Sequence, residues 1–200
     1  MKLREAERSL NLAKAEMEQK SGAKGLAGGA SAVIGARDRE ELTGVIGTIA
    51  ELCAPKDSSH EVALATAIGA GMASVVVETD EDAARAIRWL AENRAGRATF
   101  LPLNKLSSTR AAGKAAMTLR KEGVLGFAHE MLDYDPRIDI AVKFVLRNTL
   151  VVENMAYARR YMGGIRLDTL RGDMTEAGGA MVGGSQRKRT IGFGLSLIHI

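Results

Sequence analysis

Short apolar runs recur along the chain, separated by stretches in which apolar residues follow a helical spacing. Runs rich in β-branched residues predict strands, and the two without polar interruption, at 74–78 and 149–153, predict fully buried ones. Alternation at 165–170 predicts a half-exposed strand. The strand candidates are Gly44–Leu52, Ser74–Glu78, Arg97–Leu103, Val124–Phe127, Thr149–Glu153 and Ile165–Leu170.

Helices are predicted between these runs from capping residues. The predicted helix starts are Ser58 with Glu61 (running to about Ile68), Thr79 with Asp82, and Asp135 with Pro136 at the first helical position. Behind Thr79, the spacing of Ala83, Ile87, Leu90 and Ala91 predicts the buried face. Residues 109–121 predict a basic helix, and another helix is expected to run to about Tyr161.

The two ends of the chain differ from this body. Residues 2–20 have a heptad pattern, with Leu3, Leu10 and Met17 seven apart, which favours the end of a coiled-coil arm. Residues 21–43 are rich in Gly and Ala and predict a joint that leads into the body. The tail at 190–200 is apolar and without caps, and is typical of foreign read-through.

The order strand, helix, strand, helix occurs twice. It predicts a mixed α/β (α+β) fold of two related lobes, at 44–122 and 123–189, with small sheets and flanking helices. Pro102 indicates that the run at 97–103 ends at a sheet edge or leaves the sheet.

Composition narrows the class of protein. Aromatic residues make up 4% of the 200 residues, too few for an extensive stacking platform. The net charge of +4 and the pI near 9.3 favour an anionic partner. The single Cys53 excludes an internal disulfide and predicts a buried, inert thiol in a reducing compartment. No leader or membrane-length apolar run is present, so a cytoplasmic location is expected.

A glycine-rich segment near the C-terminus carries two glycine pairs, Gly178–Gly179 and Gly183–Gly184. Glycine in an extended apolar setting often marks the close approach of a second backbone. The alternative is a tight turn or bulge within one subunit.

Two basic sets suit an anionic ligand. The first follows the glycines directly and comprises Arg187, Lys188 and Arg189. The second comprises Arg110, Lys114 and Lys121 on the predicted helix at 109–121. Both are compatible with phosphate contacts that ignore base sequence, and both are equally compatible with solvated surface.

An enzyme is the competing hypothesis. His129, Glu130, Asp133 and Asp135 lie close in sequence, and such a cluster is able to bind a metal or supply acid–base groups. However, Asp135 is better explained as a helix cap, and the 200 residues contain no phosphate-cradling G-x-x-x-x-G-K-[ST] motif. We therefore expect no catalysis, no cofactor and no metal.

Five segments together resemble the hinge domain of SMC (structural maintenance of chromosomes) proteins of prokaryotic type. They are Gly44–Leu52, Val75–Thr79, Gly96–Leu103, Asn148–Val152 and Gly178–Ser185. The resemblance covers residues 25–189, and Leu3–Lys20 matches the incoming coiled-coil arm. It implies a fragment whose ATPase head segments lie elsewhere.

The resemblance implies a ring-forming homodimer with two like interfaces, each pairing strands of the two subunits. Gly178, Gly179, Gly183 and Gly184 match the interface glycines, and Ser185 replaces a third glycine common in the family. Arg187, Lys188 and Arg189 match its DNA-binding residues. The expected function is a nucleoid-associated dimerisation module that binds DNA, with a monomeric nucleic-acid-binding domain as a further alternative.

Overall fold

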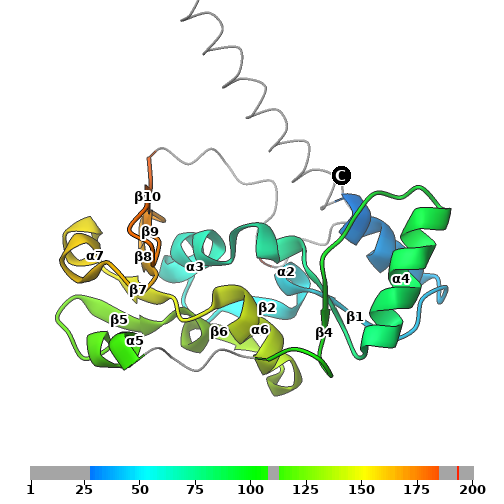
Figure 1. The fold of residues 1–200 in the computed structure, drawn as a ribbon, viewed down its shortest axis with the longest axis horizontal. Helices are drawn as coiled ribbons and strands as arrows, with labels where there is room; N and C mark the ends of the chain where they lie inside the picture. The colour runs from blue at the N-terminus through cyan, green and yellow to red at the C-terminus, as the bar shows by residue number, and fades with distance from the viewer. Residues whose placement is uncertain (1–27, 108–112, 185–192, 194–200) are drawn as a thin grey trace, which may run out of the picture.

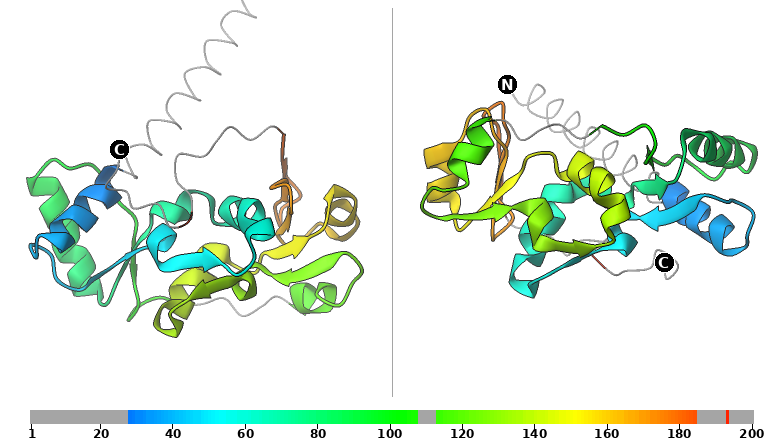
Figure 2. Two further views of the ribbon diagram at one scale, coloured as in Figure 1. Left: turned by 180° about the vertical axis from the view of Figure 1, so that it is seen from behind. Right: turned by 90° about the horizontal axis from the view of Figure 1, so that it is seen from below.

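A computed structural model describes residues 28–107, 113–184 and 193 of the chain. Two small sheets lie toward opposite ends of an elongated molecule (Figure 1). One has the strand order β1-β3-β4 and the other β10-β9-β8-β7-β5. A two-stranded sheet, β2-β6, lies between them with α3 and α6, as the views in Figure 2 also show. The expected mixed α/β fold is confirmed.

Two units with the same order of elements make up most of the body. The first contains β1 (Val45–Thr48), α2 (Ile49–Leu52), β2 (Cys53–Pro55), η1 (Ser58–His60), α3 (Glu61–Ile68), η2 (Gly69–Ala73), β3 (Val75–Val77), α4 (Asp80–Glu92) and β4 (Phe100–Pro102). The second contains β5 (Val124–Phe127), η3 (Ala128–Met131), β6 (Leu132–Tyr134), η4 (Pro136–Ile138), α6 (Asp139–Leu146), β7 (Leu150–Val152), α7 (Met155–Tyr161) and β8 (Leu167–Thr169). The short helix α5 (Gly113–Thr118) lies between the units, and β9 (Met174–Thr175) and β10 (Met181–Val182) follow them.

The two units repeat each other in strand pairing. In the first, β1 is antiparallel to β3 with a register shift before Gly47, and β3 is parallel to β4. In the second, β5 is antiparallel to β7 with a register shift before Gly126, and β7 is parallel to β8. The weak sequence signal of a duplication thus corresponds to a clear structural repeat, while the exact lobe boundaries stay predictions.

The repeat extends to the residues that end α3 and α6, which share an unusual backbone conformation. Gly69 ends α3 at φ 57° and ψ −128°, and Arg147 ends α6 at φ 55° and ψ −139°. Only glycine adopts this region without strain, which costs other residues about 1–3 kcal/mol. The second unit therefore has a strained arginine where the first has glycine.

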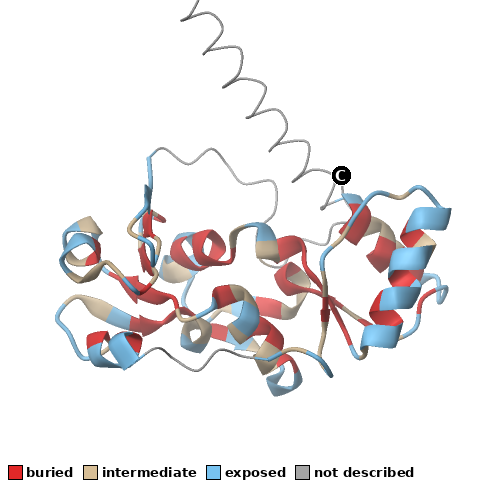
Figure 3. Ribbon diagram, in the orientation of Figure 1, coloured by how far each residue is buried: buried red, intermediate tan, exposed pale blue. Residues whose placement is uncertain are grey.

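The buried apolar residues of the described ranges form three clusters. Figure 3 shows that buried residues occur in both sheets and in the helices between them. The largest cluster joins α3 and α6 across the middle of the molecule and includes Leu64, Ile138 and Leu146. The other two pack against the outer sheets. The three residues of β3 and the three of β7 are 0% exposed, so the prediction of two fully buried strands is confirmed.

The predicted strand at 44–52 is wrong in its second half. Thr48 and Glu51 form a capping box, in which each backbone N–H is bonded by the other side chain, and the chain turns into α2. The helix at 61–68 ends where predicted, but the cap differs. Asp57, not Ser58, accepts a hydrogen bond from Ser59 N at 2.8 Å and begins η1.

The capping box at Thr79 and Asp82 is confirmed, but the face of α4 is rotated from the prediction. Ala83, Ala86 and Leu90 are buried, whereas Ile87 is 54% exposed and Ala91 is exposed as well. The difference arises because α4 packs only one narrow side on the sheet.

Residues 28–38, within the predicted joint, are helical. Ala30, Val33 and Ile34 are buried at helical spacing, and a Cβ at Gly29 would overlap the backbone of Arg97. Glycine here permits close packing of the helix against the segment that leads into β4, so the expected joint is wrong for residues 28–38.

Strand β8 is buried on both faces, so the prediction of a half-exposed strand is wrong. Leu167, Asp168 and Thr169 are at most 1% exposed. The strand lies inside the five-stranded sheet between β7 and β9 and is covered by helices, so its polar residues are buried with the apolar one. The heptad segment at 2–20 lies outside the described residues.

Candidate dimerisation edge and basic surfaces

The glycine-rich segment forms a hairpin at the edge of the five-stranded sheet. Strands β9 and β10 are antiparallel, with Met181 opposite Thr175 and Val182 opposite Met174. Strand β10 is the last in the sheet order, and no strand in the described part of the chain pairs with its outer edge. Met181 and Val182 are 49% and 54% exposed. Such an edge is a template for a second chain.

The strand is therefore Met181–Val182, and the glycines flank it. The sequence prediction rests on the glycines and does not include these two apolar residues. The signal for them was present, because an apolar pair bounded by glycines on both sides is a minimal strand.

Three of the four glycines have a role inside their own chain. Gly179 lies in the hairpin turn at φ 93°, and its N–H donates to Glu176 O at 2.9 Å. Gly184 has φ 123°. A Cβ at Gly183 would overlap the carboxylate of Asp173. These positions fit the turn interpretation as well as an interface.

Gly178 is different. It has no positive φ, and a Cβ built on it meets nothing within 4 Å. Neither conformation nor packing among the described residues requires glycine at this position. Among the four glycines, Gly178 is the one whose identity is not explained by the described residues.

A second sheet edge lies in the first unit. Strand β4 is the last strand of the order β1-β3-β4, and within the described ranges only β3 pairs with it. Pro102 lies in this strand, as predicted for an edge. By the structural repeat, β4 corresponds to β8, and β8 has β9 and β10 beyond it. Among residues 28–107 and 113–184, no strand extends the sheet of the first unit in this way.

The basic sets are only partly described. Arg110, Arg187, Lys188 and Arg189 lie outside the described residues. Lys114 lies in α5, where its Nζ donates to Met162 O at 3.3 Å and to Gly163 O. Its ammonium group thus stabilises the C-terminal end of α7.

Lys121 is exposed but does not share a helical face with Lys114. Helix α5 ends at Thr118, and the chain turns through Lys121, whose N–H donates to Thr118 O at 2.9 Å. The prediction that the helix continues to residue 121 is wrong.

Two acidic side chains of this segment, Asp135 and Asp139, have structural partners. Asp135 caps η4 by accepting from Arg137 N at 2.9 Å, as predicted. Asp139 accepts from Tyr134 Oη at 2.9 Å and pairs with Lys143 Nζ at 2.7 Å. Partial burial lowers the pKa of His129. Among the residues described, no three His, Cys, Asp or Glu side chains gather as a metal site.

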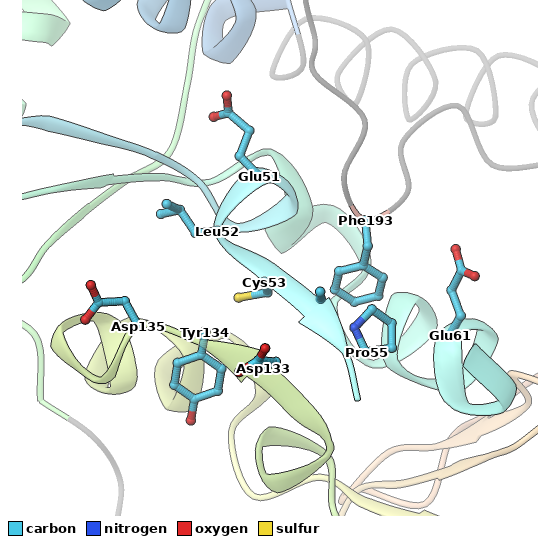
Figure 4. A pocket seen from close by; sticks show the side chains of 10 residues that line it. Glu51, Leu52, Cys53, Pro55, Glu61, Asp133, Tyr134, Asp135 and Phe193 are labelled. Atoms are coloured by element: carbon cyan, nitrogen blue, oxygen red, sulfur yellow. The ribbon is translucent and has the colours of Figure 1, made fainter. Parts of the chain in front are cut away.

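A cavity of about 660 Å³ lies beside the β2-β6 sheet (Figure 4). Cys53 is at its floor and Phe193 lies next to Pro55. Cys53 is 3% exposed, which confirms a buried thiol, and burial raises its pKa to about 12. A thiol that stays protonated is a poor nucleophile or metal ligand.

No described helix is long and apolar enough to cross a bilayer.

Comparison with known proteins gives one family. Residues 42–162 match the family described as SMC proteins Flexible Hinge Domain. The chain is 40% identical over 156 residues to the chromosome partition protein Smc of Gloeobacter violaceus, and 36% identical over 151 residues to that of Pyrococcus furiosus. These matches cover 78% and 76% of the chain, but only 13% and 12% of the two relatives.

Solved structures agree. The fold is similar to an asymmetric dimer of the Geobacillus stearothermophilus SMC hinge domain, with TM-score 0.75, 30% identity, and coverage of 92% of this chain and 77% of that one. It is also similar to the Pyrococcus furiosus SMC hinge domain, with TM-score 0.64, 32% identity, and coverage of 84% and 95%. The resemblance found in the sequence is confirmed, and the chain belongs to the SMC hinge domain family.

Proposed function

We propose that the chain is a homodimerisation module that links the coiled-coil arms of a chromosome-partitioning SMC protein and contacts DNA. The observation that carries the proposal is the open outer edge of β10, with Met181 and Val182 about half exposed. An exposed apolar strand edge favours strand addition by another chain. The solved hinge similar to this chain is a dimer.

The partner edge is β4 of a second copy. Joining β10 of one copy to β4 of the other extends the three-stranded sheet just where the structural repeat has β9 and β10 in the second unit. Two-fold symmetry then creates the same contact twice, because each copy has one β4 and one β10. The result is a closed dimer with two like interfaces.

The backbone of β4 limits the register of this pairing. Thr99 O and Leu103 N bond to β3. Alternate residues of a strand direct their N–H and C=O groups to opposite sides, so those of Ala98, Phe100 and residue 102 face outward. Because residue 102 is proline, the outward donors are those of Ala98 and Phe100. We therefore centre the pairing on residues 98–100.

Cross-linking tests this pairing. In a Cys53→Ala background, Thr99→Cys combined with Val182→Cys should give an intermolecular product with a short bismaleimide. The matched control is Ile87→Cys with Val182→Cys, since Ile87 is as exposed as Val182 but lies on α4. Equal cross-linking in both pairs, or none in the first, contradicts the β4–β10 interface.

The DNA contact is proposed for Arg187, Lys188 and Arg189, with Arg110 and Lys121 as a second surface. The net charge of +4 and the position of the triplet after β10 support it. Each phosphate neutralised adds about 0.7 (single strand) to 0.9 (duplex) to the salt slope of affinity. Glutamate at 187–189 should weaken binding and flatten that slope without changing the dimer mass. An unchanged slope contradicts the assignment.

A monomeric nucleic-acid-binding domain gives a different outcome. It would bind DNA with the same salt dependence but run at the mass of one chain and give no cross-link between 99 and 182. In the longer parent protein we place this module in the cytoplasm, associated with the nucleoid. ATP hydrolysis by that parent belongs to segments other than these 200 residues.

A further inference from the structure

A cavity of about 950 Å³ lies between the two units, bordered by α6, by β4 and by the segment around β8 and β9. Figure 1 shows α6 in front, between β4 and the edge of the five-stranded sheet. The apolar part of the lining includes Val145 and Ile165, and the polar part includes Arg147, Asn148 and Arg166. Thr99 and Leu101 border this cavity on the β4 side, so it lies beside the proposed dimer edge, whereas Phe144 of α6 and Arg147 at its end are not part of that edge.

Two cationic side chains line the cavity, and their surroundings differ. Arg166 is engaged, because its guanidinium donates to Ala67 O at 2.9 Å and pairs with Glu176 at 3.4 Å. Arg147 is exposed, and within residues 28–107 and 113–184 no carboxylate lies within salt-bridge distance of its guanidinium. The cavity thus contains one uncompensated positive charge.

Arg147 also occupies a position that the fold favours for glycine. The equivalent residue of the first unit is Gly69, with nearly the same φ and ψ. An arginine in this conformation weakens the fold, so its side chain needs a reason outside folding. Strained residues of this kind cluster at ligand sites.

An exposed aromatic ring lies one turn before the arginine. Phe144 is 46% exposed and lines the same cavity. In a chain with eight Phe, Trp and Tyr residues, an exposed ring beside a free guanidinium is distinctive. A cation for a phosphate and a ring for a base are the two elements of single-stranded nucleic-acid binding.

We propose that this cavity binds one nucleotide of single-stranded DNA, with its phosphate on Arg147 and its base on Phe144. The inference rests on the proposed DNA-binding role and adds a contact away from the 187–189 triplet. Ser107 lines the same cavity and supplies a further polar group for the phosphate or sugar.

The test variant is Arg147→Gly, because glycine relieves the backbone strain while removing the charge. We expect its thermal midpoint to equal or exceed that of the wild type, its affinity for a labelled oligothymidylate to fall, and its salt slope to decrease by about 0.7. The matched control is Arg94→Gly. Arg94 is an exposed arginine at φ 50° that does not line the cavity, so its replacement removes the same charge at another position of positive φ.

Phe144→Ala tests the base contact. We expect roughly 5- to 150-fold weaker binding of the single strand and unchanged binding of duplex, whose paired bases are not free to stack. If Arg147→Gly and Arg94→Gly bind the single strand alike while the wild type binds it well, the cavity assignment is wrong and the DNA-binding function stands. If the wild type binds no DNA, both are wrong. If either cavity variant is monomeric, the cavity belongs to the dimer interface and the inference is overturned.

Discussion

Placing charge on the outer edge of β10 should separate the proposed dimer. The perturbation is the double substitution Met181→Lys and Val182→Lys. Both side chains are about half exposed in the single chain, so lysine is accommodated there without rearrangement of the core. In the proposed dimer the same side chains lie against β4 of the partner.

The magnitude follows from the area left to bury. Complete burial of a Val or Met side chain contributes about 1.5–3 kcal/mol, so the exposed half of each contributes about 1 kcal/mol when the partner covers it. Two such residues at each of two interfaces give about 4 kcal/mol. This corresponds to a dimer roughly 1,000-fold weaker. Desolvation of the lysine ammonium groups adds to the loss.

The assay is sedimentation equilibrium over a concentration series, with the unfolding midpoint of each protein measured alongside. Ile87→Lys is the control, because Ile87 is 54% exposed, as Val182 is, but lies on α4. We expect the double variant to be a folded monomer and the control to be a dimer. A double variant that dimerises with the affinity of the wild type would refute the assignment of the β10 edge.

Three further predictions concern single residues. In the monomeric double-lysine background, Gly183→Ala should lower the unfolding free energy because its Cβ meets Asp173, whereas Gly178→Ala should change the unfolding free energy by less than about 0.5 kcal/mol. In the wild-type background, Gly178→Ala should weaken the dimer. Equal effects of the two substitutions on the unfolding free energy in denaturant titrations would count against this distinction. Burial lowers the pKa of His129 in the folded state. The neutral ring therefore contributes its full stability at pH values above the ordinary pKa of about 6.5. This contribution is lost as the pH falls from there through the lowered pKa of the folded state. His129→Gln should flatten stability against pH in that window, and an unchanged curve would show that the ring is not responsible. Cys53, with its pKa near 12 and 3% exposure, should react with an aromatic disulfide reagent only on unfolding; rapid reaction of the native protein would contradict its burial.

Local sequence signals account for much of the fold. The strands β3 and β7 were predictable because three consecutive apolar β-branched or leucine residues leave no polar face. The start of helix α4 was predictable from Thr79 and Asp82, because a capping box involves only four consecutive residues and does not depend on distant segments. The capping box of Thr48 and Glu51 lies inside an apolar run, and that run predicted a continuous strand instead of the helix α2.

Features that depend on distant segments were not predictable. Asp168 is buried because β7 and β9 flank its strand, which no periodicity within 165–170 reveals. Ile87 is exposed because the sheet covers only part of α4. The glycine-rich composition of residues 28–38 is typical of a joint. Only the contact between Gly29 and the distant Arg97 explains why glycine occurs in this helix.

The candidate site divides in the same way. The glycines drew attention to residues 178–184, but the pairing with β9 was needed to show that Met181 and Val182 form an open sheet edge. Arg147 had no sequence signal, since its importance comes from the equivalence with Gly69.

The mass of the 200-residue chain in solution tests the central claim most directly. Light scattering across a range of micromolar concentrations should give twice the chain mass of 21.3 kDa. A mass of 21.3 kDa throughout that range would contradict the account, because the open edges of β4 and β10 would then have no partner.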